Sequence, residues 1–116
     1  MTRPQRRRED FVVALTQDDE ILVQLEREDG PVVEFSVQYR ARLHGEWRAI
    51  VRFDTAHGYA HKDVSHPDGS QETQDLRLDD YGVALTRALS DVKTQWEFYR
   101  ERYERWRDGA RRTIQA

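Results

Sequence analysis

The chain has 116 residues, of which 37% are hydrophobic and 35% charged, with a net charge of −3 and a mean hydropathy of −0.96. This length suits one domain with one core, the three Trp, five Tyr and four Phe argue against a disordered chain, and the absence of cysteine excludes disulfides, thiolate metal sites and cysteine nucleophiles. No apolar run approaches the roughly 18 residues that span a bilayer, so we expect a cytoplasmic protein that does not bind membranes.

Arginine is concentrated at the two ends of the chain. Residues 1–8 hold four Arg and no acid, and residues 98–112 hold six Arg against three acids, whereas the stretch between them is acidic. Basic ends of this kind can meet nucleic acid, but a solvated helix face and a disordered arm give the same pattern. We predict a flexible basic arm over residues 1–9 and a single α+β domain over residues 10–112.

Two short apolar runs open the domain. Residues 11–15 are continuously apolar and residues 21–25 alternate, so both predict strands. The second run also fits a helical turn capped by Asp18 or Asp19, because periodicity does not settle five residues. Residues 28–31 then have the chemistry of a turn.

The clearest strand signal lies between residues 35 and 54, where apolar residues alternate on both sides of His44–Gly45. A two-residue loop there would put the two apolar sets on opposite faces of the sheet, so we predict a three-residue loop that includes Leu43. This register pairs Ala41 with Trp47 and places both in the core. The other face then carries polar side chains, namely Arg40, Arg48, Arg52 and Asp54.

A third strand over residues 59–65 is expected to return beside residues 47–54 through a four-residue loop. Pleat geometry then puts five polar side chains on one face of the sheet, beneath His57 in the loop. These are Arg52, Asp54, Tyr59, His61 and Asp63. Residues 66–69 predict a turn and residues 71–78 a weak edge strand. The expected sheet is an antiparallel β-meander of about five strands over about residues 11–77.

One long C-terminal helix is predicted over about residues 80–108, capped by Asp79 or Asp80 and stopped at Gly109. Its apolar residues form a heptad seam: Leu85, Leu89, Val92, Trp96, Tyr99, Tyr103 and Trp106.

Such a helix is about 43 Å long, whereas a strand of eight or nine residues covers under about 30 Å. The helix should therefore overhang the sheet on which it packs. The residues that then need a further partner are Trp96, Tyr99, Tyr103 and Trp106. A second copy of the chain in a homodimer would supply one, and so would the strands of residues 11–25 in the same chain.

Histidines and carboxylates gather over residues 54–66. Cleavage of RNA through its 2′-hydroxyl needs a base, an acid and a cation for the phosphate, and histidine can serve as either of the first two. We therefore predict catalytic roles for Arg52, Asp54, His57 and His61, and binding roles for Arg40, Arg48, Tyr59 and Asp63. This chemistry needs no metal or other cofactor.

Other roles for these residues stay open. Asp54 can cap the loop that follows it, and Arg52 can form a salt bridge across the sheet. A metal site is a further alternative, which the spacing does not decide. Its ligands would come from His57, His61, His66 and Asp63.

The segment Arg52-Phe53-Asp54-Thr55-Ala56-His57, followed by His61-Lys62-Asp63 and His66-Pro67-Asp68-Gly69, resembles a small prokaryotic family of uncharacterised proteins. More distantly it resembles the TumE-type toxins of type II toxin–antitoxin modules, which have an Arg-aromatic-Asp-Asn-Ala motif before a histidine-rich turn. Thr55 stands where those proteins usually have Asn, and the long aromatic helix is not part of their pattern. The resemblance implies a compact toxin that acts on RNA and is held by a separate antitoxin.

Two functions follow as hypotheses. The first is a toxin-like protein of a toxin–antitoxin type module, acting as a metal-independent ribonuclease or an RNA-binding protein. The second is a non-enzymatic module that dimerises or binds a partner through the aromatic helix.

Overall fold

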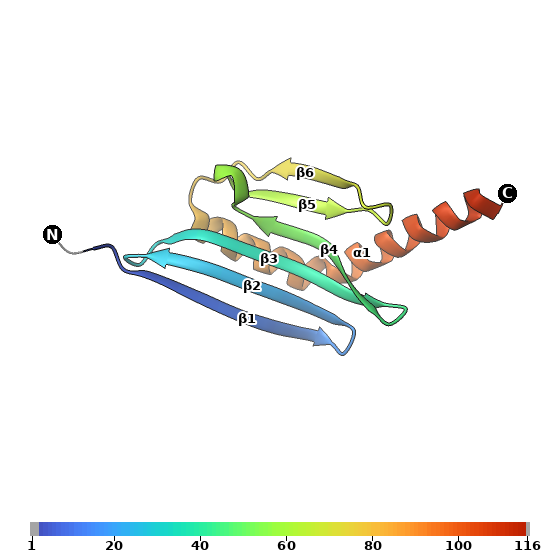
Figure 1. The fold of residues 1–116 in the computed structure, drawn as a ribbon, viewed down its shortest axis with the longest axis horizontal. Coiled ribbons are helices and arrows are strands. Elements are labelled where there is room, and N and C mark those ends of the chain that lie inside the picture. Colours follow the sequence, from blue (N-terminus) through green and yellow to red (C-terminus); the bar gives the residue numbers. More distant parts are fainter. Residues whose placement is uncertain (1–2, 116) are drawn as a thin grey trace.

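In the computed structural model, six strands form one antiparallel sheet and one long helix packs on it (Figure 1). The structure describes residues 3–115 and the side chains of residues 3–109. The elements are β1 (Arg6–Thr16), β2 (Asp19–Glu28), β3 (Val32–Leu43), β4 (Glu46–Asp54), the 3₁₀ turn η1 (Ala56–Gly58), β5 (His61–Ser65), β6 (Gln71–Asp75) and α1 (Tyr81–Gln115). The strands lie side by side in chain order. The predicted α+β meander is confirmed, with six strands rather than about five because the weak edge strand forms.

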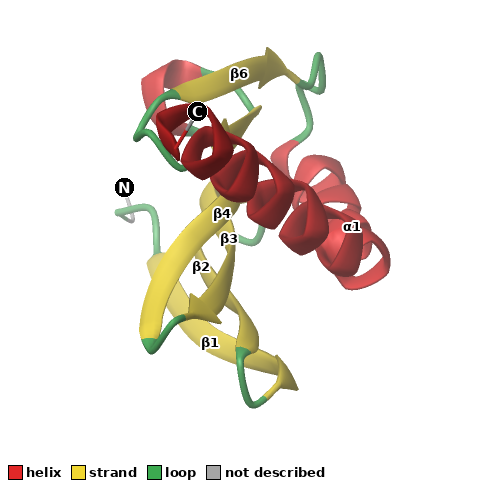
Figure 2. Cartoon of the chain, turned by 90° about the vertical axis from the view of Figure 1, so that its right-hand side faces the viewer, coloured by secondary structure: helices red, strands yellow, loops and turns green. Residues whose placement is uncertain are grey.

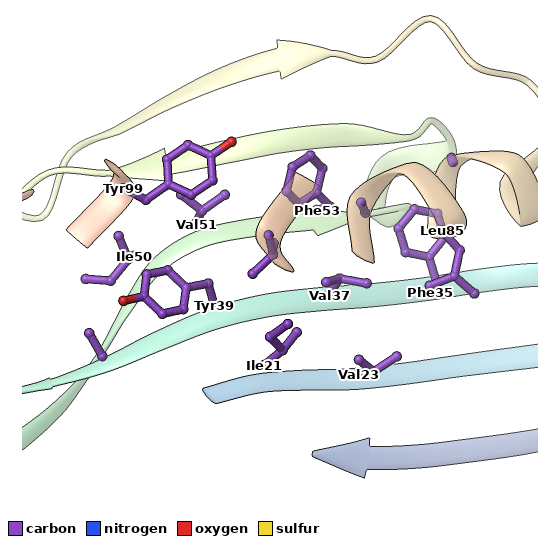
Figure 3. Packing of buried hydrophobic residues seen from close by; sticks show 14 of the residues in the cluster. Ile21, Val23, Phe35, Val37, Tyr39, Ile50, Val51, Phe53, Leu85 and Tyr99 are labelled. Carbon is purple, nitrogen blue, oxygen red and sulfur yellow. The ribbon is translucent and has the colours of Figure 1, made fainter. Parts of the chain in front are cut away.

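The core lies between one face of the sheet and α1, and Figure 2 shows that the helix covers that face alone. Alternation of side chains in β3 explains this arrangement: every second residue from Phe35 to Leu43 is buried. Val37 and Tyr39 have no exposed surface. Their side chains point toward the helix, as Figure 3 shows. The opposite face of the sheet, which we call the open face, is left for polar residues.

The helix begins where the sequence predicts and ends later. Asp80 Oδ1 accepts hydrogen bonds from the backbone N–H groups of Gly82 and Val83, at 2.9 and 3.1 Å, which makes Asp80 the N-cap. The predicted end at Gly109 is wrong, because α1 continues to Gln115. Gly109 does not have the positive φ that a helix-ending glycine adopts. In the described part of the chain no helix is long and apolar enough to cross a membrane.

The aromatic end of the helix is covered by its own chain. Tyr99 and Tyr103 are 4% and 5% exposed, and the Trp96 ring lies 6.2 Å from the ring of Tyr39 in β3. Trp106 stacks on the ring of His66, in the turn between β5 and β6, with 3.9 Å between centroids. The sheet therefore supplies the contacts for which a second copy was expected. Dimerisation through the helix stays a prediction that would have to use other surfaces.

The N-terminal segment is not an arm beyond residue 5. Strand β1 begins at Arg6, which is paired with Glu28 of β2 and forms ion pairs with Glu26 and Glu34. The prediction of a flexible arm over residues 1–9 is therefore wrong for Arg6 to Glu9. The carboxylates that offset Arg6 lie on β2 and β3, so the arginine run by itself does not indicate them.

The β3–β4 hairpin has the two-residue turn that we had excluded. His44 and Gly45 both have positive φ, 52° and 79°, as a type I′ turn requires, and Leu43 pairs with Glu46. A β-bulge restores the alternation further along, because Ile50 has no partner in β3. The predicted register is wrong because a bulge can replace the third loop residue.

Because of this bulge, the side chains of β4 before Ile50 lie on the opposite face of the sheet from the one predicted. Trp47, predicted in the core, is 39% exposed and lies on the open face. The guanidinium groups of Arg40 and Arg42 lie over its ring at 5.6 and 5.5 Å from the centroid. These cation–π contacts compensate for the loss of the buried position.

A buried carboxylate joins α1 to the sheet. Asp19 is 2% exposed, and it accepts hydrogen bonds from the Tyr39 hydroxyl at 2.6 Å, from Thr16 Oγ1 at 2.6 Å and from Arg100 of α1 at 2.9 Å. Burial raises the pKa of Tyr39 well above its ordinary value, so this hydroxyl remains a donor.

We predict that Asp19→Ala lowers the free energy of unfolding by about 3 kcal/mol, because Tyr39 and Arg100 lose their common acceptor. Urea unfolding followed by circular dichroism measures this change. The control is Glu46→Ala, which removes an exposed ion pair with Arg48 and should cost less than about 1 kcal/mol. Equal losses in the two variants would contradict the role given to Asp19.

A half-buried lysine faces the helix from β5. Lys62 Nζ lies 4.7 Å from the ring centroid of Tyr99 and donates a hydrogen bond to its hydroxyl at 2.8 Å; that hydroxyl donates to Asp91. Burial lowers the pKa of Lys62 from its usual 10.5. The unfolded chain therefore holds this proton more tightly than the folded chain. The contribution of Lys62 to stability rises with pH from its lowered pKa up to 10.5.

We predict that the Lys62→Met variant is at least as stable as the wild type at pH 7. Its free energy of unfolding should not show the rise toward alkaline pH that Lys62 causes in the wild type. The measurement is the free energy of unfolding in urea at pH 7 and at about pH 10. Lys93→Met, which changes an exposed lysine of α1, serves as control and should keep the wild-type pH dependence. A large loss of stability in Lys62→Met at pH 7 would overturn this account.

Candidate functional site

Polar residues of β4 and β5 meet on the open face. Asp54 pairs with His61 and Arg52 pairs with Asp63. The predicted four-residue loop is wrong, because the connection that contains η1 has six residues and β5 begins at His61 rather than at Tyr59, which shifts the register by two residues. A shift of two residues leaves each side chain on its predicted face. The structure therefore brings these residues together in a different register.

Three of them form a close group, which we call the Asp54–His61–Asp63 cluster. His61 Nε2 lies 2.9 Å from Asp54 Oδ1 and 3.4 Å from Asp63 Oδ2. One donor atom from each residue lies within 4.8 Å of the other two. The His61 side chain is 4% exposed and the two carboxylates are 13% and 15% exposed, so the cluster is largely shielded from water.

Each member of the cluster is also held from outside it. Nδ1 of the histidine lies 3.2 Å from the carbonyl oxygen of Tyr59. The backbone N–H of Ala56 donates to Asp54 at 3.0 Å, which is the loop-capping role that the sequence left open. Thr73 Oγ1, from β6, donates to Asp63 at 2.7 Å. These bonds fix the orientation of all three side chains.

The orientation of the His61 ring turns its Nε2 atom toward the carboxylates of Asp54 and Asp63. A carbonyl oxygen only accepts, so Nδ1 carries the hydrogen of this contact. A neutral ring would then turn the lone pair of Nε2 toward two carboxylates, which would repel it. A positive species at Nε2, either a proton or a metal ion, removes this repulsion.

Two further aromatic residues surround the cluster. The Tyr59 ring lies 4.9 Å and the His57 ring 6.4 Å from the His61 ring, centroid to centroid. His57 is exposed, and its φ of 69° places its backbone in the left-handed region within η1. It is the one predicted catalytic histidine that reaches solvent.

His57 and Asp54 line an open cavity of about 500 Å³. The sequence did not indicate three of the polar residues that also line it: Arg8, Gln24 and Ser36. Arg8 was assigned to an arm. Ser36 pairs with Asp54, and Gln24 pairs with Ser36. These three residues therefore lie side by side across the sheet, and only the correct register shows this. Thr73, which supports Asp63, was missed for the same reason.

Two predicted binding residues do not join the site. Arg48 is six residues from Asp54 along β4, about 20 Å, and its charge is offset by Glu46 at 2.7 Å. Arg40 forms an ion pair with Glu20 at 2.5 Å. Both arginines have carboxylate partners at the other end of the hairpin, so their role at a phosphate stays a prediction that these contacts do not support. Arg52 is exposed and stays beside the cluster.

The four-ligand metal set considered from sequence does not assemble. His66 lies against Trp106, and its Nε2 is 3.4 Å from Glu72 rather than near His61. Only His61 and Asp63 of that set share a site, and Asp54 takes the third place.

Comparison with known proteins assigns the chain to a family. A family model described as "Domain of unknown function (DUF7718)" matches residues 5–109, which include all six strands and the cluster. No match was found among curated proteins or among solved structures. The matched residues cover most of the sequence, and the chain therefore belongs to the DUF7718 family, a domain of unknown function.

Proposed function

We propose that this protein is a toxin-like, RNA-directed protein that binds and cleaves RNA on the open face, where the cavity meets the Asp54–His61–Asp63 cluster. The observation that carries the proposal is the position of His57, an exposed imidazole at the rim of a polar cavity beside a fixed, buried group. An imidazole that reaches solvent at such a cavity is placed to contact a bound substrate and to act as a general base. The resemblance of residues 52–69 to toxin-like proteins supports RNA as the substrate.

The groups that would hold the RNA lie on the open face. Arg8, Gln24 and Ser36 line the same cavity as His57, and Arg52 lines a second one that Gln24 and Ser36 also border. The two arginines supply positive charge for phosphates, and Gln24 and Ser36 supply hydrogen-bonding groups for the sugar or base. The Arg8 guanidinium pairs with the exposed Asp10 at 3.1 Å, the one ion pair it makes among the residues that the structure describes, and exposed pairs of this kind contribute little energy. This arginine can therefore turn to a phosphate at small cost.

In the proposed reaction His57 accepts the proton of the 2′-hydroxyl. The 2′-oxygen attacks phosphorus, and the bond to the 5′-oxygen breaks as that oxygen takes up one proton from solvent. The arginines offset the charge that develops on the phosphate. A toxin of this type would act in the cytoplasm and would be held inactive by an antitoxin.

We predict that His57→Asn slows cleavage of a labelled single-stranded RNA about 100-fold or more, because it removes the base. Asparagine tolerates positive φ, so the backbone of η1 is preserved. His44→Asn is the matched control, since His44 is also exposed and has a φ of 52°, but lies at the far end of β4. Wild-type protein that leaves RNA intact, or equal rates for the two variants, would refute the proposal.

Partner binding through α1 is a second candidate function. The helix continues past Trp106, and its final turns project beyond the sheet (Figure 1). Phe98 is 47% exposed, and Arg102 lies over both Phe98 and Trp106, at 5.2 and 4.9 Å. Phe98 and Arg102, four residues apart, form a ridge beside Trp106, whose ring is already stacked on His66, and a second copy could pack on this ridge.

If this ridge forms a homodimer, Phe98→Asp should convert a dimer to a monomer, because a charge would be buried in the interface. Light scattering after size exclusion gives the mass. Val83→Asp, which changes another exposed apolar residue of α1, should leave the mass unchanged. A wild-type mass of one chain would exclude this function for the homodimer.

A further inference from the structure

The Asp54–His61–Asp63 cluster has the composition of a metal site. It presents one imidazole nitrogen and two carboxylate groups from two adjacent strands. We propose that this cluster binds one divalent metal ion through His61 Nε2 and one oxygen each of Asp54 and Asp63. The proposal does not depend on RNA cleavage, because ion binding is measured directly.

The distances within the cluster fit this use. With metal–ligand bonds of about 2.1 Å, neighbouring ligand atoms lie about 3.0 Å apart in an octahedral site and about 3.4 Å apart in a tetrahedral one. The two distances from His61 Nε2, 2.9 Å to Asp54 and 3.4 Å to Asp63, match these values. The three donor atoms lie within 4.8 Å of one another.

The hydrogen bonds from outside the cluster form a second observation. A histidine that binds a metal almost always donates its other ring N–H to a carbonyl or carboxylate, and ligating carboxylates are themselves hydrogen-bonded. His61 has this contact with the Tyr59 carbonyl, and Ala56 and Thr73 supply it to the two carboxylates. Each of the three ligands is therefore held by a hydrogen bond from outside the cluster.

The charge of the cluster suits a divalent ion. Two carboxylates in a largely buried group carry two negative charges, which a divalent ion bound to a neutral imidazole offsets. Arg52 lies opposite Asp63, but among the ion pairs of the described residues none joins these two side chains.

The donor set also indicates which ion would bind. One nitrogen and two carboxylate oxygens suit Mn²⁺ or Zn²⁺ better than Ca²⁺, which prefers six to eight oxygens. Three protein ligands leave coordination positions for water or for a ligand. His57 lies next to these positions, and a metal ion there would supply the positive charge that Arg40 and Arg48 do not bring to the site.

The test is calorimetric titration of the chelator-treated protein with Mn²⁺ and with Zn²⁺. We expect one ion per chain, about 10-fold or greater weakening in Asp63→Asn, and about 10-fold weakening in Thr73→Val, which leaves the ligands in place but removes a supporting hydrogen bond. Asp10→Asn, which changes an exposed carboxylate on another strand, should bind as the wild type does. Circular dichroism confirms that each variant is folded.

A second readout identifies the ligand. In histidine ring NMR spectra, Zn²⁺ should shift the His61 signals and leave those of His44 and His66 unchanged. The proposal fails if neither ion binds, if Asp10→Asn and Asp63→Asn lose affinity equally, or if His61 is unaffected at saturation.

Discussion

A single helix can bury only one face of a sheet, and the whole arrangement of this protein depends on that constraint. The apolar seam of α1 covers the strands β2 to β4, where the fully buried residues Ile21, Val37 and Val92 meet. The other face must then present side chains that tolerate water. Because this face carries polar side chains such as Gln24, Ser36 and Arg52, it can hold chemistry without disturbing the core.

The candidate site gains its rigidity from the same arrangement. Its members lie on β4 and β5, whose backbones are fixed by ladder hydrogen bonds, and β6 supplies the hydroxyl that holds Asp63. His57 alone lies on a turn, which gives it exposure without moving the cluster. A fixed, buried His–carboxylate group beside one accessible histidine is a suitable combination for binding an ion and transferring a proton.

The sequence predicted which residues share a face better than it predicted which residues pair. The heptad seam of α1 and the cap at Asp80 could be predicted because both depend on local spacing. The common face of Asp54, His61 and Asp63 follows from the alternation of a strand, and it survives a shift of two residues. The register itself depends on the bulge at Ile50. Since both Ile50 and Val51 are apolar, their sequence does not reveal that bulge.

Charge was the other feature that local sequence could not settle. Arg6 looks like part of a disordered arm and Arg48 like a phosphate ligand, but each has a carboxylate nearby in the folded chain. Arg8 and Thr73 act at the site although neither lies in the histidine-rich segment. Contacts between distant strands decide these roles, and a single sequence does not contain them.

The central claim is that the Asp54–His61–Asp63 cluster is built to hold a positive ion. A crystal structure of the protein grown with Mn²⁺ tests it most directly, through the anomalous difference map. The account predicts a peak within about 2.3 Å of His61 Nε2 and of one oxygen from each carboxylate. A map without a peak there at saturating Mn²⁺, with Nε2 hydrogen-bonded to Asp54 as a plain ion pair, would contradict it.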